Sequence, residues 1–225
     1  MQLYERPAIP GSPKSLQFRL STTRMYSCLG YMIPARLSTA PGELRLDLGD
    51  VTQVPGPCPA AIGPAVGDVT LPATARGTFT LRLRHRGQED QYRLVLEEDR
   101  IELSPLRARF SASQNPPVLL RAPEGALHVQ CIFKDWENPC RERAAAGGPT
   151  CETFFADPVI ARLKPLELKT GTYSLGFFNS PEGCDVRAPE GVEALARYLS
   201  EHYRDPSNCL YITVYTWQGG GFANL

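Results

Sequence analysis

The sequence of 225 residues lacks the short motifs that most often identify a chemistry. It has three histidines, and none of its cysteines forms the Cys-x-x-Cys pair that is typical of structural zinc sites. The glycine run at 219–221 has no Lys after it and no helix-forming segment, so it is not a phosphate-binding loop. We therefore expect no cofactor and no bound metal.

Long apolar runs are also missing. No segment approaches the roughly 18 consecutive apolar residues that cross a bilayer, so no transmembrane segment is expected. The first fifteen residues, MQLYERPAIPGSPKS, lack the apolar stretch of a signal peptide. Either the protein is not exported, or a signal has been removed, and the cysteines favour removal.

An excess of charge of one sign is absent as well, because the formal net charge is zero. Residues 1–125 carry 15 basic and 12 acidic side chains, and the remainder carries 9 and 12, so the halves lie near +3 and −3. Neither half has the basic surface that nucleic-acid binding requires. We expect no nucleic-acid partner.

What the chain does contain is cysteine, spread singly among Pro- and Gly-rich turns, which favours a disulfide framework and an oxidising compartment. Cys28 and Cys58 are the only cysteines of the N-terminal half and are predicted to pair. Cys140 and Cys151 flank a Gly-rich segment and are a second candidate pair. An odd total leaves one thiol free or bonded between chains. The seven cysteines are Cys28, Cys58, Cys131, Cys140, Cys151, Cys184 and Cys209.

The clearest structural pattern is at 78–103. Apolar and polar residues alternate around two short polar breaks, which predicts three antiparallel strands with one apolar face. Together with alternating segments upstream, this gives about seven short strands with turns between them. We predict an N-terminal antiparallel β-sandwich of immunoglobulin-like size at 16–110, after a flexible leader at 1–15. The polar, Pro-rich segment 111–117 is interpreted as a linker.

The second half predicts a small α/β domain at 118–218, followed by a flexible tail at 219–225. Strands are expected at 126–133, 171–179 and 209–217. An amphipathic helix is expected from about Pro189 to Tyr203, and a shorter one from Asp157, its N-cap, to Leu163. The fold class overall is therefore α+β.

Candidate catalytic residues are few. Cys184 with His202 would make a nucleophile and base, with His128 as a further candidate, if folding brought them together. The alternative is a disulfide cysteine and a histidine placed favourably at a helix C-terminus. His128 and Cys131 could also ligate zinc, but on a strand their spacing places them on opposite faces.

Asp135-Trp136-Glu137 is a candidate binding surface, in which two carboxylates flank an exposed-looking indole. This arrangement suits a protein or carbohydrate ligand, although Trp136 can equally anchor a contact between the two domains.

These observations predict an exported or cell-envelope binding or scaffold protein, stabilised by disulfides and secreted, periplasmic or surface-anchored. The alternatives are an enzyme with a Cys/His site in the crevice between the domains, a metal-binding envelope protein, and a cytoplasmic protein with reduced thiols. Ligand identity and oligomeric state are left open by the sequence.

Overall fold

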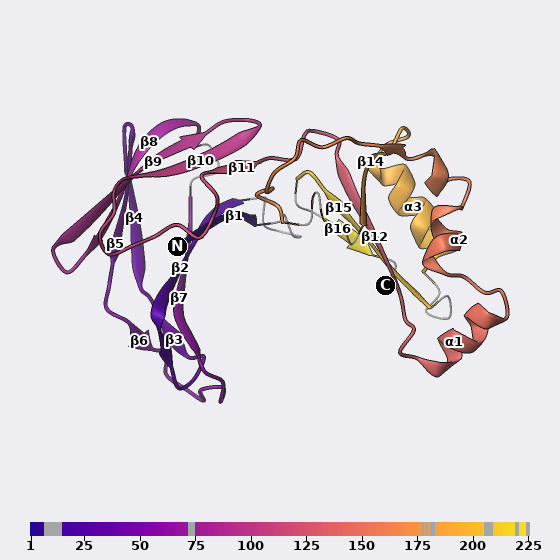
Figure 1. Ribbon diagram of the computed structural model, residues 1–225, viewed down its shortest axis with the longest axis horizontal. Coiled ribbons are helices and arrows are strands. Elements are labelled where there is room, and N and C mark those ends of the chain that lie inside the picture. The colour runs from indigo at the N-terminus through magenta and orange to yellow at the C-terminus, as the bar shows by residue number, and fades with distance from the viewer. Residues whose placement is uncertain are drawn as a thin grey trace. The chain divides into compact units, whose positions relative to one another are not determined.

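The computed structural model describes residues 1–6, 15–71, 75–176, 178, 180, 183–204, 209–218 and 221–223. Strands account for 47% of the structure and helices for 13%, so the fold is mostly β, with several sheets and three α-helices among the described residues. The chain divides into two compact units (Figure 1), the first formed by residues 1–6 and 15–121 and the second beginning at Ala122. No helix of the described residues is long and apolar enough to span a bilayer.

The first unit consists of two sheets. One has the strand order β1-β2-β7-β3-β6 and the other β11-β10-β9-β8-β5-β4. The strands are β1 (Gln2–Arg6), β2 (Ser15–Tyr26), β3 (Tyr31–Met32), β4 (Ala35–Ala40), β5 (Glu43–Leu48), β6 (Thr52–Gln53), β7 (Gly63–Thr70), β8 (Gly77–His85), β9 (Gln88–Leu96), β10 (Arg100–Arg107) and β11 (Val118–Leu120).

The predicted three-stranded meander is confirmed as β8, β9 and β10, which are antiparallel neighbours. Its alternating apolar side chains are buried, as the period of two requires. The turn between β8 and β9 is tighter than the sequence implied, because β9 already begins at Gln88. Arg86 and Gly87 form it with φ of 48° and 77°, the positive values of a two-residue hairpin turn.

One apolar core is shared by the two sheets. Leu3 and Phe18 come from the first sheet, and Leu46, Leu81 and Leu94 from the second, and all belong to a single buried cluster. This arrangement fits a β-sandwich. The pairing is not purely antiparallel, however, since β8 runs parallel to β5 and β3 parallel to β7. The chain leaves β5, contributes β6 and β7 to the other sheet, and returns beside β5 in the same direction.

The segment 111–117 does not separate the two units. Asp90, which is completely buried, accepts hydrogen bonds from the backbone N–H groups of Arg109 (2.8 Å), Phe110 (3.1 Å) and Ser111 (2.8 Å). The Tyr92 hydroxyl donates to the Ser111 carbonyl oxygen over 2.9 Å. The division therefore falls after β11, because buried polar groups fix the chain that leads into that strand.

The first residues are a strand rather than a flexible leader, since β1 pairs with β2 along its whole length. Residues 7–14 of the expected leader lie outside the described part of the chain. The unit is closed by a buried ion pair, in which Arg121 Nε lies 3.2 Å from Glu5 Oε1. Arg121 Nη1 also donates to the Glu97 carbonyl oxygen over 2.6 Å. Burial lowers the pKa of Arg121, and the carboxylate of Glu5 opposes that shift.

The second unit is built on an antiparallel sheet with the order β13-β14-β12-β15-β16. Figure 1 shows α2 and α3 on one side of this sheet, where their apolar residues join the strands in a second core. Its elements are β12 (Leu127–Phe133), α1 (Asn138–Ala145), α2 (Cys151–Phe155), a 3₁₀ turn η1 (Ile160–Arg162), β13 (Lys164–Pro165), β14 (Gly183–Arg187), α3 (Val192–His202), β15 (Leu210–Thr216) and β16 (Gly221–Ala223).

Several elements of this unit differ from expectation. The strands β12 and β15 and the helix α3 are confirmed, with Leu195 and Leu199 buried on the apolar stripe of α3. The strand expected at 171–179 is not formed in the described part of that segment, where Tyr173 makes an isolated β-bridge and the side chains of Tyr173, Leu175 and Phe178 are buried. β14 pairs with β12 instead.

The remaining differences lie in the short elements. Asp157 Oδ1 accepts from the N–H groups of Val159 and Ile160 as an N-cap does, but only the 3₁₀ turn follows. α1 and α2 have weak sequence signals because both are short. Part of the expected tail is strand β16, paired with β15.

We predict that Arg121→Met lowers the free energy of local unfolding around β1 and β11 by about 3 kcal/mol, because it leaves the Glu5 carboxylate buried without its counter-ion. Hydrogen exchange of peptides from these strands, measured by mass spectrometry across a urea series, gives that free energy. Arg19→Met is the matched control, since Arg19 and Asp68 form an exposed pair, with side chains 50% and 41% accessible. Equal losses in the two variants would contradict the role assigned to the buried pair.

Candidate functional site

The structure contains three disulfides, and these decide several of the candidate roles. Cys28 pairs with Cys58 as expected. Cys140 and Cys151 do not pair with each other: Cys140 is bonded to Cys209 and Cys151 to Cys131. Cys140 lies in α1 and Cys151 in α2, and each helix is bonded to the sheet: α1 to the residue before β15, and α2 to β12.

The disulfide of Cys131 also bears on the zinc hypothesis. A cysteine in a disulfide has no thiolate to offer a metal. No group of three or more potential metal ligands occurs among the residues that the structure describes.

Cys184 is the free cysteine of the described chain, and it lies on a different face of the sheet from His128. The register places Cys184 opposite Val129 and His128 opposite Asp185. Because side chains alternate along a strand, Cys184 faces the helix-covered core, and His128 faces the other side. Burial raises the pKa of the Cys184 thiol, and the charge of Asp185 raises it further. A nucleophilic cysteine needs the opposite shift.

His202 lies at the C-terminal end of α3, and its ring stacks on Tyr198 with the centroids 4.3 Å apart. The Tyr198 hydroxyl donates in turn to Asp157 Oδ2 over 2.7 Å, as does that of Tyr203 over 2.9 Å. Burial raises the pKa of Tyr198, and the hydrogen bond to Asp157 adds to it, giving about 12. These contacts place Tyr198 and its neighbours in a cluster that fixes α3 against the chain after α2.

His128 forms an enclosed polar pair with Asp185 in the second unit. It is 1% exposed, and its Nδ1 lies 2.9 Å from Asp185 Oδ1. The rings of Phe178 and Tyr215 lie 6.3 Å from its ring, centroid to centroid. A carboxylate at Nδ1 orients a histidine so that Nε2 is the nitrogen left for further chemistry. That nitrogen faces the backbone of Gly183, since a Cβ built there would come within 2.6 Å of it.

The pairing of His128 with Asp185 was not found from the sequence. His128 was a candidate residue and Asp185 follows the candidate Cys184, but only the register of β12 against β14 shows that the two are opposite each other. The pair links β12 to β14 on the side of the sheet away from the helices, so its role is to hold these two strands together.

Trp136 lies in an exposed turn between β12 and α1, with 61% of its surface accessible. Asp135 and Glu137 on either side are exposed as well. Both ends of the turn are bonded to Cys209. The Lys134 N–H, before the turn, donates to the Cys209 carbonyl oxygen over 3.0 Å, and Cys140, after the turn, forms a disulfide with Cys209. The indole is thus presented on a fixed base.

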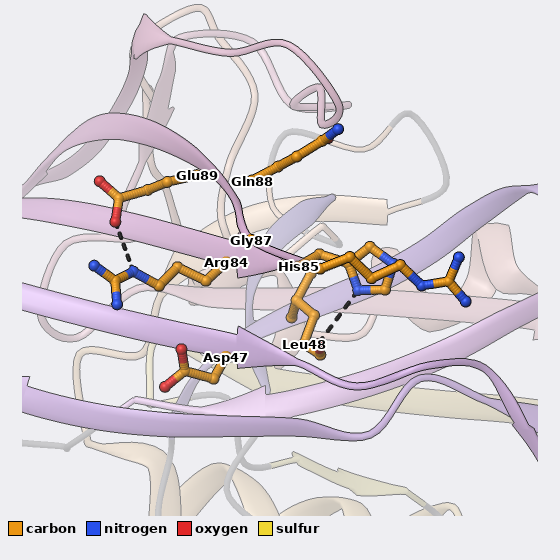
Figure 2. Close-up of a pocket in the computed structure, with 8 residues that line it drawn as sticks. Asp47, Leu48, Arg84, His85, Gly87, Gln88 and Glu89 are labelled. Atoms are coloured by element: carbon orange, nitrogen blue, oxygen red, sulfur yellow. Dashed lines mark hydrogen bonds and ion pairs between the residues drawn. The ribbon is translucent and has the colours of Figure 1, made fainter.

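The first unit has an open depression of about 510 Å³ at the β8–β9 turn. Figure 2 shows Arg84 directed toward Glu89, with Arg84 Nε 2.6 Å from Glu89 Oε2, and His85 beside Leu48, with His85 Nδ1 3.3 Å from the Leu48 carbonyl oxygen. Hydrogen bonds from Arg84, Gln91 and Arg82, in that order, lower the pKa of Glu89 to about 2. The depression is lined by Asp47, Leu48, Arg84, His85, Arg86, Gly87, Gln88 and Glu89.

This depression has no signature in the sequence, because the parallel pairing of β5 with β8 is what brings Asp47 beside Arg84. Its main charged groups already have partners: Arg86 Nε, for example, is 2.7 Å from Asp50 Oδ1. A ligand would have to displace these ion pairs, so the depression is a weaker candidate than the Trp136 turn.

Comparison with known proteins gives no match: no protein-family model, curated protein or solved structure resembles the chain significantly.

We expect Gly183→Ala to destabilise the second unit by about 1–3 kcal/mol, because the added Cβ would lie 2.5 Å from the Val129 carbonyl oxygen and 2.6 Å from His128 Nε2. Both tryptophans of the chain are in this unit, so urea unfolding followed by tryptophan fluorescence reports on it. Gly176→Ala is the control, since its Cβ would meet no atom within 4 Å. The close packing of β14 on His128 is refuted if both variants unfold at the same urea concentration.

Proposed function

We propose that the protein is an exported binding protein, secreted or held in the cell envelope, that presents the Trp136 turn to a carbohydrate. The observation that carries the proposal is the Cys140–Cys209 disulfide beneath that turn. It belongs to a set of three disulfides that is consistent with a secreted protein. It also joins α1 to the residue before β15, and so restrains the turn that carries the exposed indole.

The chemistry of the turn suits a sugar. An indole ring offers a flat apolar face on which the C–H face of a pyranose can stack, and its N–H is a hydrogen-bond donor. The carboxylates of Asp135 and Glu137 accept hydrogen bonds from hydroxyl groups. Two carboxylates favour neutral or amino sugars over acidic ones, because like charges repel.

An enzyme that uses Cys184 with a histidine is less well supported. The thiol faces the helix-covered core with a raised pKa, and His128 is on the other side of the sheet. A scaffold role remains compatible with the same binding surface.

The compartment is tested by counting thiols in protein produced through a secretory pathway. Denaturation without reductant is expected to expose one alkylatable thiol, Cys184, and reduction should raise the number to seven. Before denaturation Cys184 should react slowly, because burial disfavours its thiolate. Alkylation with iodoacetamide and peptide mapping gives the count and the positions. Seven reactive thiols in the unreduced protein would refute the export hypothesis.

The binding surface is tested by screening the wild type and Trp136→Ala against neutral and N-acetylated glycans. Retention on immobilised glycan is measured for both proteins, and tryptophan fluorescence follows binding by the wild type. Loss of the indole is expected to weaken binding at least tenfold, since one aromatic side chain supplies most of the stacking area. Leu106→Ala, at another exposed apolar residue (59% accessible), should leave retention unchanged. Unaltered retention of Trp136→Ala would rule out the turn as the sugar site.

A further inference from the structure

One end of the first unit exposes an unusual number of large apolar side chains. We call it the apolar tip: it comprises the end of β2, the strands β3 and β6, the start of β7, and the chain between them at 27–30 and 54–62. Its exposed residues have 40–75% of their surface accessible to solvent. They are Met25, Leu29, Met32, Val54, Ile62 and Val66.

These side chains belong to neighbouring positions. Met32 is the cross-strand partner of Val66, and Met25 pairs with Pro64. The Leu29 side chain lies against the backbone of Gly63, the residue that follows Ile62. The tip is therefore one contiguous apolar surface rather than a set of isolated exposed residues.

The tip contains no charge. Segments 25–35 and 51–67, which supply its surface, have no acidic or basic residue and no histidine. The first charges on either side are Arg24, Arg36 and Asp50, together with Asp68, which is paired with Arg19 over 3.0 Å. A surface without charge cannot select a partner by ion pairing, so its affinity must come from the removal of apolar area from water.

The exposed conformation is held by covalent and backbone bonds. Cys28–Cys58 ties the two segments together. The Leu29 N–H donates to the Pro59 carbonyl oxygen over 3.3 Å, and the Val54 N–H to the Gly30 carbonyl oxygen over 2.7 Å. These bonds fix the backbone that carries the exposed side chains.

Next to the apolar residues come aromatic ones and then a cation. The rings of Tyr26 and Tyr31 stack with their centroids 4.4 Å apart. The Arg24 guanidinium lies 5.2 Å from the Tyr26 ring centroid. From Leu29 back to Tyr26 at the end of β2 and then to Arg24, the order is aliphatic, tyrosine, arginine, which matches hydrocarbon, interface and headgroup phosphate in a bilayer.

We propose that the apolar tip docks on a lipid bilayer by shallow insertion. Leu29 and Ile62 enter the acyl boundary, the tyrosine pair lies at headgroup level, and Arg24 meets phosphate. A lipid surface fits better than a protein partner because the tip offers apolar side chains over a whole end of the unit and no charge for specificity. This role goes beyond sugar binding at Trp136 and does not depend on it.

The test is co-sedimentation of the full-length protein with sucrose-loaded phosphatidylcholine vesicles. The wild type is expected to pellet with the vesicles, and Ile62→Asp or Leu29→Asp should lower the partition coefficient at least tenfold. Leu106→Asp is the matched control, because Leu106 is also exposed (59%) but lies on β10, outside the tip, and it should bind as the wild type does. Circular dichroism and thermal unfolding show that each variant is folded.

Three results would overturn the proposal. The first is a wild type that pellets with neither phosphatidylcholine vesicles nor vesicles containing phosphatidylglycerol. The second is binding that requires phosphatidylglycerol and is unaffected by Ile62→Asp, which would make it electrostatic. The third is a dimer in sedimentation equilibrium that Ile62→Asp dissociates while vesicles are not bound, in which case a second copy covers the tip. Glycan retention by the same variants reports separately on the Trp136 turn.

Discussion

The buried carboxylate of Asp90 holds the chain after β10 against the core of the first unit. A charge removed from water must be satisfied by hydrogen bonds, and Asp90 takes them from three consecutive backbone N–H groups and the Ser111 hydroxyl. Although burial opposes ionisation, these bonds hold the pKa of Asp90 below its ordinary value. These bonds fix the chain after β10 against the core. This position allows β11 to pair with β10 and places Arg121 beside Glu5. The position of the edge strand β11 therefore depends on the Asp90 carboxylate.

The second unit is organised by cross-links as much as by its core. Disulfides join α1 and α2 to strands of the sheet, and the Asp157 cluster fixes α3 to the chain after α2. Short helices of this kind gain little from their own hydrogen bonds and need tertiary contacts to persist. The Trp136 turn lies next to one of these cross-links, which restrains its backbone while the indole stays exposed.

Three sequence inferences failed, each for a different reason. The polar, Pro-rich composition of 111–117 correctly indicates irregular chain, but composition does not show that buried groups hold that chain in place. The candidates Cys184, His202 and His128 rest on residue type alone, and the separation of Cys184 from His128 depends on which face of the sheet each occupies. The Cys140–Cys151 pair was inferred from spacing along the chain, whereas a disulfide requires proximity in space and the direction of each Cβ.

The sequence by itself determined the alternating strands of the first unit, the amphipathic helix α3 and the Cys28–Cys58 disulfide. Local periodicity decides the first two, and the third had one possible partner within its half of the chain. Only the tertiary structure decided the His128–Asp185 pair, the partners of Cys131 and Cys140, the parallel entry of β8 beside β5, and the gathering of Met25, Leu29 and Ile62 at one tip. These depend on register and crossover, which join residues far apart in sequence and leave no periodic trace in it.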